Sequence, residues 1–195
     1  MQAFDWQNLM ARWNAALLAD SEIDSYVEPE VIDSSWLGFP GATEGQIAAA
    51  QHRLGVSLPP SYREFLKHTN GWRILNFTIE RLWSTEEVEW FAVNHQRIID
   101  AWQQEDRLSI SDEEYFVYDQ RQDETAIRVE YLQSCLHISD TGDAADLLLN
   151  PEIVTSDGEW EGWFLAPWLP GAQRYRSFWD LMQATYQEFL ERSDW

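Results

Sequence analysis

Two successive helices are marked by start and stop signals in the first half of the chain. Thr43 and Gln46 form a capping box, in which each side chain can satisfy a backbone amide of the other residue. Apolar residues follow at helical spacing, and Gly55 supplies the left-handed residue that commonly ends a helix. Pro60 or Ser61 can begin a second helix, where a missing amide hydrogen has no cost, and Gly71 lies just beyond the end. The pattern predicts a helical hairpin whose apolar faces need a further layer to pack against.

The composition predicts one globular domain. With 195 residues, 45% of them apolar, and with 12 Trp, 9 Phe and 7 Tyr, the chain can bury a sizeable core. We expect a single domain over residues 1–195, in which residues 1–35 form an N-terminal helix and an acidic connector. One cysteine, no leader-like segment after Met1 and no run of about 20 apolar residues predict a cytoplasmic protein without a membrane span.

Helices are expected at both ends of the chain, with strands between them. The spacing predicts an amphipathic helix over 5–19, and Ser177 is expected to begin the last helix. A second capping box, Ser84 with Glu87, predicts a helix that carries Phe91. β-Favouring side chains predict one or two strands over Ile74 to Leu82, and further strands over Tyr115–Tyr118, Ile127–Leu132, Cys135–Ser139 and Trp163–Ala166. The expected fold class is α+β, a mostly antiparallel sheet packed against the N- and C-terminal helices and the hairpin, and covered on one face.

The hairpin segment resembles the SUKH superfamily. The resemblance rests on apolar, glycine and proline positions: Leu37, Gly38, Pro40, Gly41, Ala42, Thr43, Ile47, Leu54, Gly55, Leu58, Pro59, Pro60, Ser61, Tyr62, Phe65, Leu66, Asn70 and Gly71. It continues more weakly where the family has a strand, a Gly-Asp turn, a second strand and a last helix, here Leu136–Ile138, Gly142-Asp143, Asp146–Leu149 and Ser177–Leu181. It covers residues 36–191, and departs from the family in the acidic segment before Trp36 and in the charged stretch from Asp119 to Gln133. The superfamily includes fungal regulators of cell-wall glucan synthesis and many bacterial immunity proteins, so the resemblance implies a protein-binding function.

Two short motifs resemble catalytic ones. Asp140 begins an Asp-Thr-Gly triplet, but aspartic-protease chemistry needs two carboxylates that share a proton, and this triplet is also an ordinary turn. Cys135 and His137 lie two residues apart on a predicted strand, roughly 6–7 Å along the chain, which does not bring a base to a thiol. We therefore expect a protein that is not an enzyme, with Cys135 as a small buried apolar residue. A hydrolase that uses Asp140 or Cys135 is the third hypothesis.

Metal-ligand spacing is also not apparent in the sequence. The four histidines are scattered and are expected at solvated positions: His52, His68, His95 and His137. Three aspartates do not match the spacing of a calcium-binding loop and are expected in a solvated turn: Asp140, Asp143 and Asp146. The sequence thus predicts no metal and no cofactor.

Acidic residues outnumber basic ones by 34 to 13, which leaves a net charge of −21. Such a field repels nucleic acid and anionic membranes, and it speeds the encounter with a basic protein. Because acidic surfaces also keep proteins soluble, charge alone does not distinguish binding from solubility. The same charge opposes close self-association at low salt, so we expect a monomer or a weak dimer.

Charge and resemblance together predict a non-enzymatic immunity protein that binds and neutralises a basic cognate toxin. A nuclease is the toxin class that suits an acidic face best, because carboxylates can occupy a cleft built for phosphates. Tryptophans beside glutamates in a loop-rich stretch are typical of interface anchors, and the alternative is that they cap the open end of the sheet. The expected partner-binding residues fall in three groups: Glu28, Glu30 and Asp33; Asp112, Glu113 and Glu114; and Asp157, Glu159, Trp160, Glu161 and Trp163. The second hypothesis is a general protein-interaction or regulatory module, related to the fungal regulators, with several weak partners.

Overall fold

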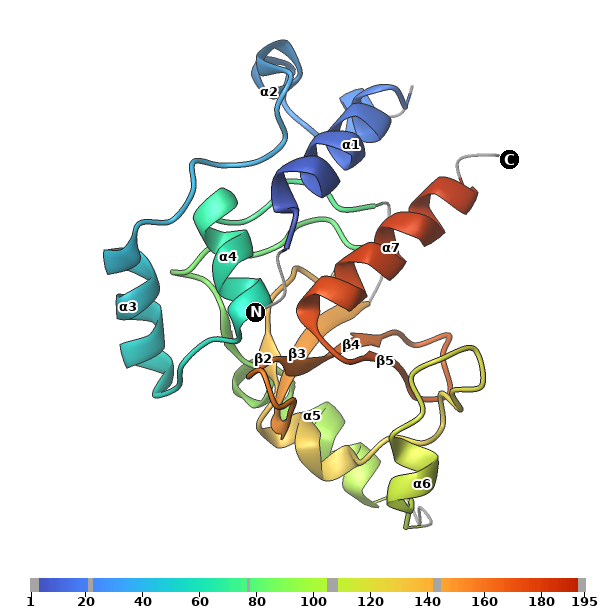
Figure 1. The fold of residues 1–195 in the computed structure, drawn as a ribbon. Coiled ribbons are helices and arrows are strands. Elements are labelled where there is room, and N and C mark those ends of the chain that lie inside the picture. Colours follow the sequence, from blue (N-terminus) through green and yellow to red (C-terminus); the bar gives the residue numbers. More distant parts are fainter. Residues whose placement is uncertain (1–3, 21–22, 77, 105–108, 142–144, 193–195) are drawn as a thin grey trace.

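Helices surround a central sheet in the computed structural model of the chain, which describes residues 4–20, 23–76, 78–104, 109–141 and 145–192 (Figure 1). No helix within these residues has the length and apolar character needed to cross a membrane. In chain order, the described elements are α1 (Trp6–Leu18), the 3₁₀ helix η1 (Ile23–Ser25), α2 (Pro29–Ser34), α3 (Glu44–Leu54), α4 (Pro60–His68), β1 (Glu89–Trp90), α5 (Phe91–Gln104), α6 (Asp112–Tyr115), the 3₁₀ helix η2 (Val129–Gln133), β2 (Leu136–His137), β3 (Asp146–Val154), β4 (Trp160–Leu165), β5 (Ala172–Tyr175) and α7 (Phe178–Arg192). The predicted fold class, α+β with helices at both chain ends, is confirmed.

The helical hairpin, α3 and α4, begins and ends as its sequence predicts. The Thr43 hydroxyl accepts a hydrogen bond from the Gln46 amide at 3.2 Å, and the Gln46 side chain accepts one from the Thr43 amide at 2.9 Å. Gly55 follows α3 with a φ of 74°, in the left-handed region. On α4, the ring of Phe65 lies 5.3 Å from the rings of Trp6 in α1 and Phe178 in α7. The hairpin therefore packs through α4 onto the helices of both chain ends.

The five strands form one antiparallel sheet in the order β1-β2-β3-β4-β5. Paired residues point to the same face of a sheet, and successive residues point to opposite faces. The register thus sets one row of side chains across β2 to β5: His137, Leu148, Trp163 and Arg174. In the neighbouring row, a Cβ on Gly162 would lie 3.1 Å from a side chain of α7, so this glycine allows the close approach of that helix.

Both faces of the sheet are buried, so the expectation of a single covered face is wrong. One cluster of buried apolar side chains joins Leu147 and Leu149 of β3 to α1, α4 and α7. A second cluster joins Leu148 of the same strand to Phe91 and Ile99 of α5. A strand between two layers is buried on both sides, which explains why the first five residues of β3 are buried without a break.

Two of the predicted strands are helical turns. Ser111 caps α6, so residue 115 ends a short helix where a strand over Tyr115–Tyr118 was expected. The strand expected over Ile127–Leu132 is largely the 3₁₀ helix η2. Both segments cover the α5 face of the sheet, where a short run of aromatic and branched residues can be buried without pairing as a strand.

Other boundaries differ as well. The stretch from Ile74 to Leu82 has isolated bridges only at Leu82, which pairs with Trp72 and Ser139, and no extended strand among its described residues. Phe77 lies outside the described residues. The capping box of Ser84 and Glu87 closes a turn, with bonds of 2.7 and 3.0 Å, and the helix follows only at Phe91. The stretch expected to be loop-rich, around Trp160, is strand β4, and the Gly142-Asp143 turn lies outside the described residues.

Candidate partner-binding surface

The structure separates the three acidic groups predicted from the sequence. Glu28, Glu30 and Asp33, here called the α2 group, are exposed at and beside α2. Asp112, Glu113 and Glu114, the α6 group, are exposed on α6 at the opposite end of the molecule (Figure 1). The remaining residues, the β4 group, lie in or just before β4: Asp157, Glu159, Trp160, Glu161 and Trp163.

Four of the five side chains of the β4 group are buried, which corrects the expectation that they form an exposed anchor. Glu159 and Trp160 are 4% and 6% exposed, and Glu161 and Trp163 are 0% exposed. The reason is that β4 lies between β3 and β5 and so points its side chains into the two covered faces. Only Asp157, before the strand, is exposed.

Glu159 serves the fold by capping α4. Its carboxylate accepts hydrogen bonds from the backbone amide of Ser61 at 2.8 Å and from the Ser61 hydroxyl at 2.5 Å. Free amides at the start of a helix favour such a negative group. Burial raises the pKa of Glu159, and the two bonds from Ser61 oppose that rise.

Glu161 is the centre of a buried polar network. Its carboxylate accepts hydrogen bonds from the hydroxyls of Tyr115 at 2.6 Å and Tyr118 at 2.8 Å. It also accepts them from the Asn150 side chain at 2.9 Å and from the indole N–H of Trp163 at 2.6 Å. The guanidinium of Arg174 lies 3.5 Å away, with both side chains fully buried. Burial, followed by the charge of Glu161, raises the pKa of Tyr115 and Tyr118.

The same network fixes the segment that follows α6. Gln122 bonds to the backbone of Arg174 in both directions, at 2.7 and 2.8 Å, so its side chain pairs with β5 as a neighbouring strand would. At Gly171, a Cβ would lie 2.0 Å from the backbone oxygen of Glu124, so only glycine allows this contact. The charged stretch after Asp119, which departs from the family pattern, therefore covers the outer edge of the sheet.

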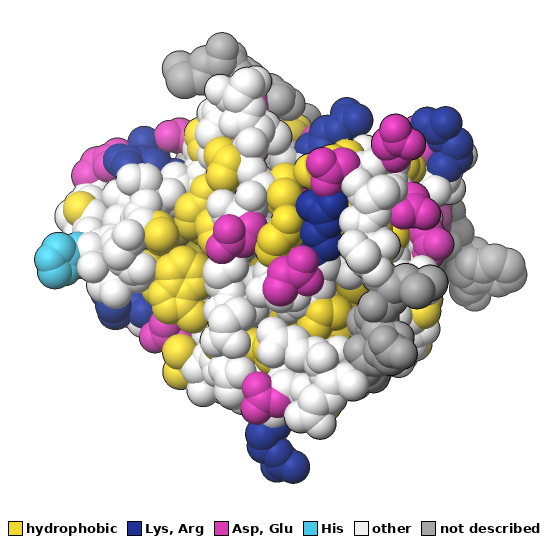
Figure 2. All heavy atoms as spheres, turned by 90° about the horizontal axis from the view of Figure 1, so that it is seen from below, with side chains coloured by type: hydrophobic (Ala, Val, Ile, Leu, Met, Phe, Trp, Pro, Cys, Tyr) yellow, Lys and Arg dark blue, Asp and Glu magenta, His cyan; other side chains and the backbone are white. Residues whose placement is uncertain are grey.

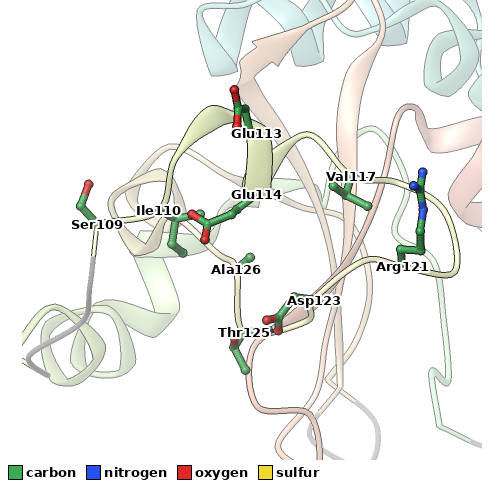
Figure 3. Close-up of a pocket in the computed structure, with 9 residues that line it drawn as sticks. All are labelled: Ser109, Ile110, Glu113, Glu114, Val117, Arg121, Asp123, Thr125 and Ala126. Carbon is green, nitrogen blue, oxygen red and sulfur yellow. Dashed lines mark hydrogen bonds between the residues drawn. The ribbon is translucent and has the colours of Figure 1, made fainter.

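A hollow of about 630 Å³ lies between α6 and this segment (Figure 3). Its lining residues are Ser109, Ile110, Glu113, Glu114, Val117, Arg121, Asp123, Thr125 and Ala126. Figure 3 shows Ser109 at one end and Arg121 at the other, with Glu114 and Asp123 between them. Arg121 is paired with Asp119 at 2.6 Å.

The three carboxylates of the α6 group have different surroundings. Asp112 forms an ion pair with Arg128. Glu114 accepts hydrogen bonds from the hydroxyl and the backbone amide of Ser111 at 2.8 and 3.0 Å, and these bonds lower its pKa. Glu113, at the edge of the hollow, has neither a hydrogen bond nor an ion pair with the described residues, and Figure 3 shows its carboxylate pointing away from Glu114 and Asp123.

Exposed apolar side chains accompany these carboxylates. Phe116, directly after α6, is 43% exposed, and Val93 and Ile98 on α5 are 62% and 43% exposed. Figure 2, which views the molecule from the side of α5 and α6, shows apolar side chains gathered among acidic ones. Such a surface can bind a basic side chain electrostatically and an apolar one by contact.

Sequence reasoning missed Phe116 and Asp123 as members of this surface. A readable signal was present, because Ser111 and Glu114 have the spacing of a capping box. That spacing predicts a helix start at residue 112, and with it the exposure of the acidic first turn.

The residues considered for catalysis are engaged in the fold. Cys135 is fully buried, and burial raises the pKa of its thiol well above the ordinary value, so a thiolate is disfavoured. The Asp140 carboxylate is paired with Arg81 at 3.0 Å and accepts a hydrogen bond from the Trp83 indole. Neither arrangement provides an activated nucleophile with a base beside it.

Residues 41–192 match the family model of the SMI1 / KNR4 family (SUKH-1). No curated protein matches the chain significantly. The matched residues include the hairpin, all five described strands of the sheet and the whole of α7, and they make up well over half of the chain. The resemblance inferred from the hairpin is thereby confirmed. The chain belongs to the SMI1 / KNR4 family (SUKH-1).

Proposed function

We propose that the chain is an immunity protein that binds and neutralises a basic toxin without catalysis, through the hollow beside α6. The family includes both immunity proteins and SMI1/KNR4 regulators, so membership supports a binding function of either kind. The observation that carries the proposal is the hollow itself, which Glu113, Glu114 and Asp123 line on a chain with a net charge of −21.

The mechanism is occlusion. A guanidinium or ammonium group of the toxin enters the hollow and meets these carboxylates, while Phe116 supplies apolar contact at the rim. An acidic surface of this kind suits a nuclease, because a phosphate-binding cleft is basic and is blocked when carboxylates fill it. Long-range attraction between the opposite charges speeds the encounter, which is useful for an inhibitor that must act before the toxin does.

A tagged pull-down from the native host, washed at low and at high salt, is the first experiment. A single basic partner, present in equal amount and released more readily at high salt, supports an immunity protein. Several weak partners that do not share a basic surface would instead indicate the regulatory module.

The hollow is then tested with two charge reversals that change the net charge equally. Glu113→Arg, at the hollow, is expected to weaken binding of the isolated partner at least about tenfold, mainly through slower association. Glu30→Arg, in the exposed α2 group at the other end of the molecule, is expected to change the affinity less than about threefold. Equal losses in both variants would mean that only the overall charge matters. A loss confined to Glu30→Arg would assign binding to the α2 group.

A further inference from the structure

Two histidines and one aspartate from distant parts of the chain meet between α5 and the sheet. His95 belongs to α5, His137 to β2 and Asp146 to the first position of β3. One ring nitrogen of each histidine and one carboxylate oxygen of Asp146 all lie within 4.8 Å of one another. The expectation of solvated positions is wrong here, since His137 and Asp146 are 2% and 5% exposed and His95 is partly buried.

The backbone explains the meeting of these three residues. His137 pairs with Leu148 across β2 and β3, so Asp146, two residues before Leu148, lies on the same face of the sheet. That face is covered by α5. The helix α5 is interrupted at His95 itself, where φ is −123° and ψ is 19°.

Two ring nitrogens of this cluster have no hydrogen bond to the described residues. Nε2 of His137 lies 3.0 Å from Oδ1 of Asp146, yet it has no hydrogen bond of acceptable geometry, and Nδ1 of His95 is buried with no hydrogen-bond partner in the described part of the chain. A hydrogen bond needs the N–H to point at the oxygen, whereas two ligands of one ion point at a shared third position. Ligand atoms about 2.0–2.2 Å from a zinc ion are about 3.4 Å apart at the tetrahedral angle. The 3.0 Å between His137 and Asp146 is close to this value, and the remaining atoms, which lie within 4.8 Å, can approach an ion placed between them.

Neighbouring groups hold the three side chains in place. The Thr141 hydroxyl donates a hydrogen bond to Oδ1 of Asp146 at 2.6 Å. The ring of His95 stacks on that of Phe91 at 4.2 Å, and the ring of His137 lies 4.4 Å from that of Trp83. Outer contacts of this kind orient the ligands of metal sites and limit access of solvent.

We propose that His95, His137 and Asp146 bind one divalent transition-metal ion of the Zn²⁺ class. Two imidazoles and a carboxylate suit zinc, whereas Ca²⁺ and Mg²⁺ take oxygen ligands. Three protein ligands leave one tetrahedral position for water or for a side chain of a binding partner. The ion ties α5 to β2 and β3 and thereby stabilises the face of the sheet that also carries α6.

Zinc binding to the untagged protein, after removal of metals with a chelator, tests the proposal by calorimetric titration and by thermal unfolding. One Zn²⁺ per chain is expected, with a rise in Tm of about 5–10 °C when zinc exceeds its Kd about 100-fold. MgCl₂ at the same concentration is expected to leave Tm unchanged. No zinc binding, or an equal rise in Tm with Mg²⁺, would overturn the proposal.

Variants assign the ligands. His95→Ala, at the partly buried position, is expected to weaken zinc binding at least about 100-fold and to abolish the rise in Tm. Asp146→Asn keeps the shape of the side chain and is expected to weaken binding as well, and both variants should lose the visible absorption of bound tetrahedral Co²⁺. His52→Ala on the surface of α3 and Cys135→Ala beside the cluster are the controls, and they should keep wild-type affinity. Unchanged affinity in His95→Ala and Asp146→Asn, or a loss in either control, would place the zinc elsewhere and refute the site.

Discussion

Although Glu161 is one of several closely spaced acidic residues in the sequence, its carboxylate accepts hydrogen bonds from the side chains of Tyr115, Tyr118, Asn150 and Trp163. Its neighbours Glu159 and Asp157 have different roles, one capping α4 and the other lying exposed before β4. Charge and spacing do not separate these three residues in the sequence, because all lie within five positions of one another. What separates them is the alternation of β4 between two covered faces, which becomes evident only once both faces are known.

Removal of the Glu161 carboxylate should be costly. Glu161→Leu leaves the hydroxyls of Tyr115 and Tyr118, the indole of Trp163 and the Arg174 charge without their partner. We expect the free energy of unfolding to fall by about 3–5 kcal/mol, measured by urea denaturation. Glu152→Leu, the same change at an exposed position of β3, should alter it by about 0.5 kcal/mol or less. Similar losses in both variants would contradict the role of the network.

Glu86 makes the free energy of unfolding depend on pH. Burial acts to raise its pKa, but hydrogen bonds from Gln46, Thr85 and Asn70 outweigh that effect and lower the pKa to about 2, from an ordinary 4.5. Because the folded pKa lies below the unfolded one, this carboxylate stabilises the fold above about pH 4.5, and the contribution is lost as the pH falls toward 2.

The loss of stability between about pH 6 and about pH 3 should therefore be smaller in Glu86→Gln than in the wild type, as measured by urea midpoints. Glu113→Gln removes an exposed carboxylate without partners and serves as the control, in which the wild-type loss should persist. If the wild type and Glu86→Gln lose the same stability over this pH range, Glu86 does not contribute to the pH dependence.

At the scale of elements, the hairpin depends on one close backbone contact. A Cβ on Gly41 would lie 1.9 Å from the backbone oxygen of Lys67, near the end of α4, whereas a Cβ on Gly45 has its nearest neighbour at 3.8 Å. Gly41→Ala is expected to lower the free energy of unfolding by about 1–3 kcal/mol, since backbone must move. Gly45→Ala, in the first turn of α3, is expected to raise it by about 0.5–1 kcal/mol. Chemical denaturation of both variants measures the difference, and a loss of the same size in both would contradict the contact.

The sequence predicted helices better than strands, for a physical reason. Capping residues act locally, so Thr43, Gln46 and Gly55 predict α3 wherever it lies in the fold. Strands β1 and β5 contain two and four residues, and their burial depends on neighbours brought from elsewhere in the chain. Arg174 illustrates the difficulty, because a fully buried arginine in a strand is intelligible only beside Glu161 and Gln122.

At the scale of the whole molecule, charge and contact surface were predictable to different degrees. The net charge of −21 follows from composition, and so does the class of partner that it favours. The separation of the α2 and α6 groups to opposite ends does not, since it depends on the order of the layers. The hollow was also beyond prediction, because it lies between α6 and a segment expected to contain strands.

The overall charge should also limit stability at low salt. Raising NaCl from about 10 mM to about 150 mM shortens the screening length from about 30 Å to about 8 Å, which weakens repulsion among the acidic groups. We expect Tm to rise by a few degrees over this range, as followed by circular dichroism. Near the sequence pI of 4.3, where the net charge is small, the same change in salt should have little effect. A Tm at neutral pH that stays constant or falls with salt would contradict self-repulsion.

The contact between Glu159 and Ser61 has a consequence for synthesis of the protein. The two residues are 98 positions apart, so the amide at the start of α4 emerges from the ribosome long before the carboxylate that caps it. The hairpin is thus made early but receives its cap late, together with β4 and the centre of the sheet. A nascent chain that ends before β4 keeps an apolar hairpin without its sheet, and it is at this stage that the polypeptide most needs protection from aggregation.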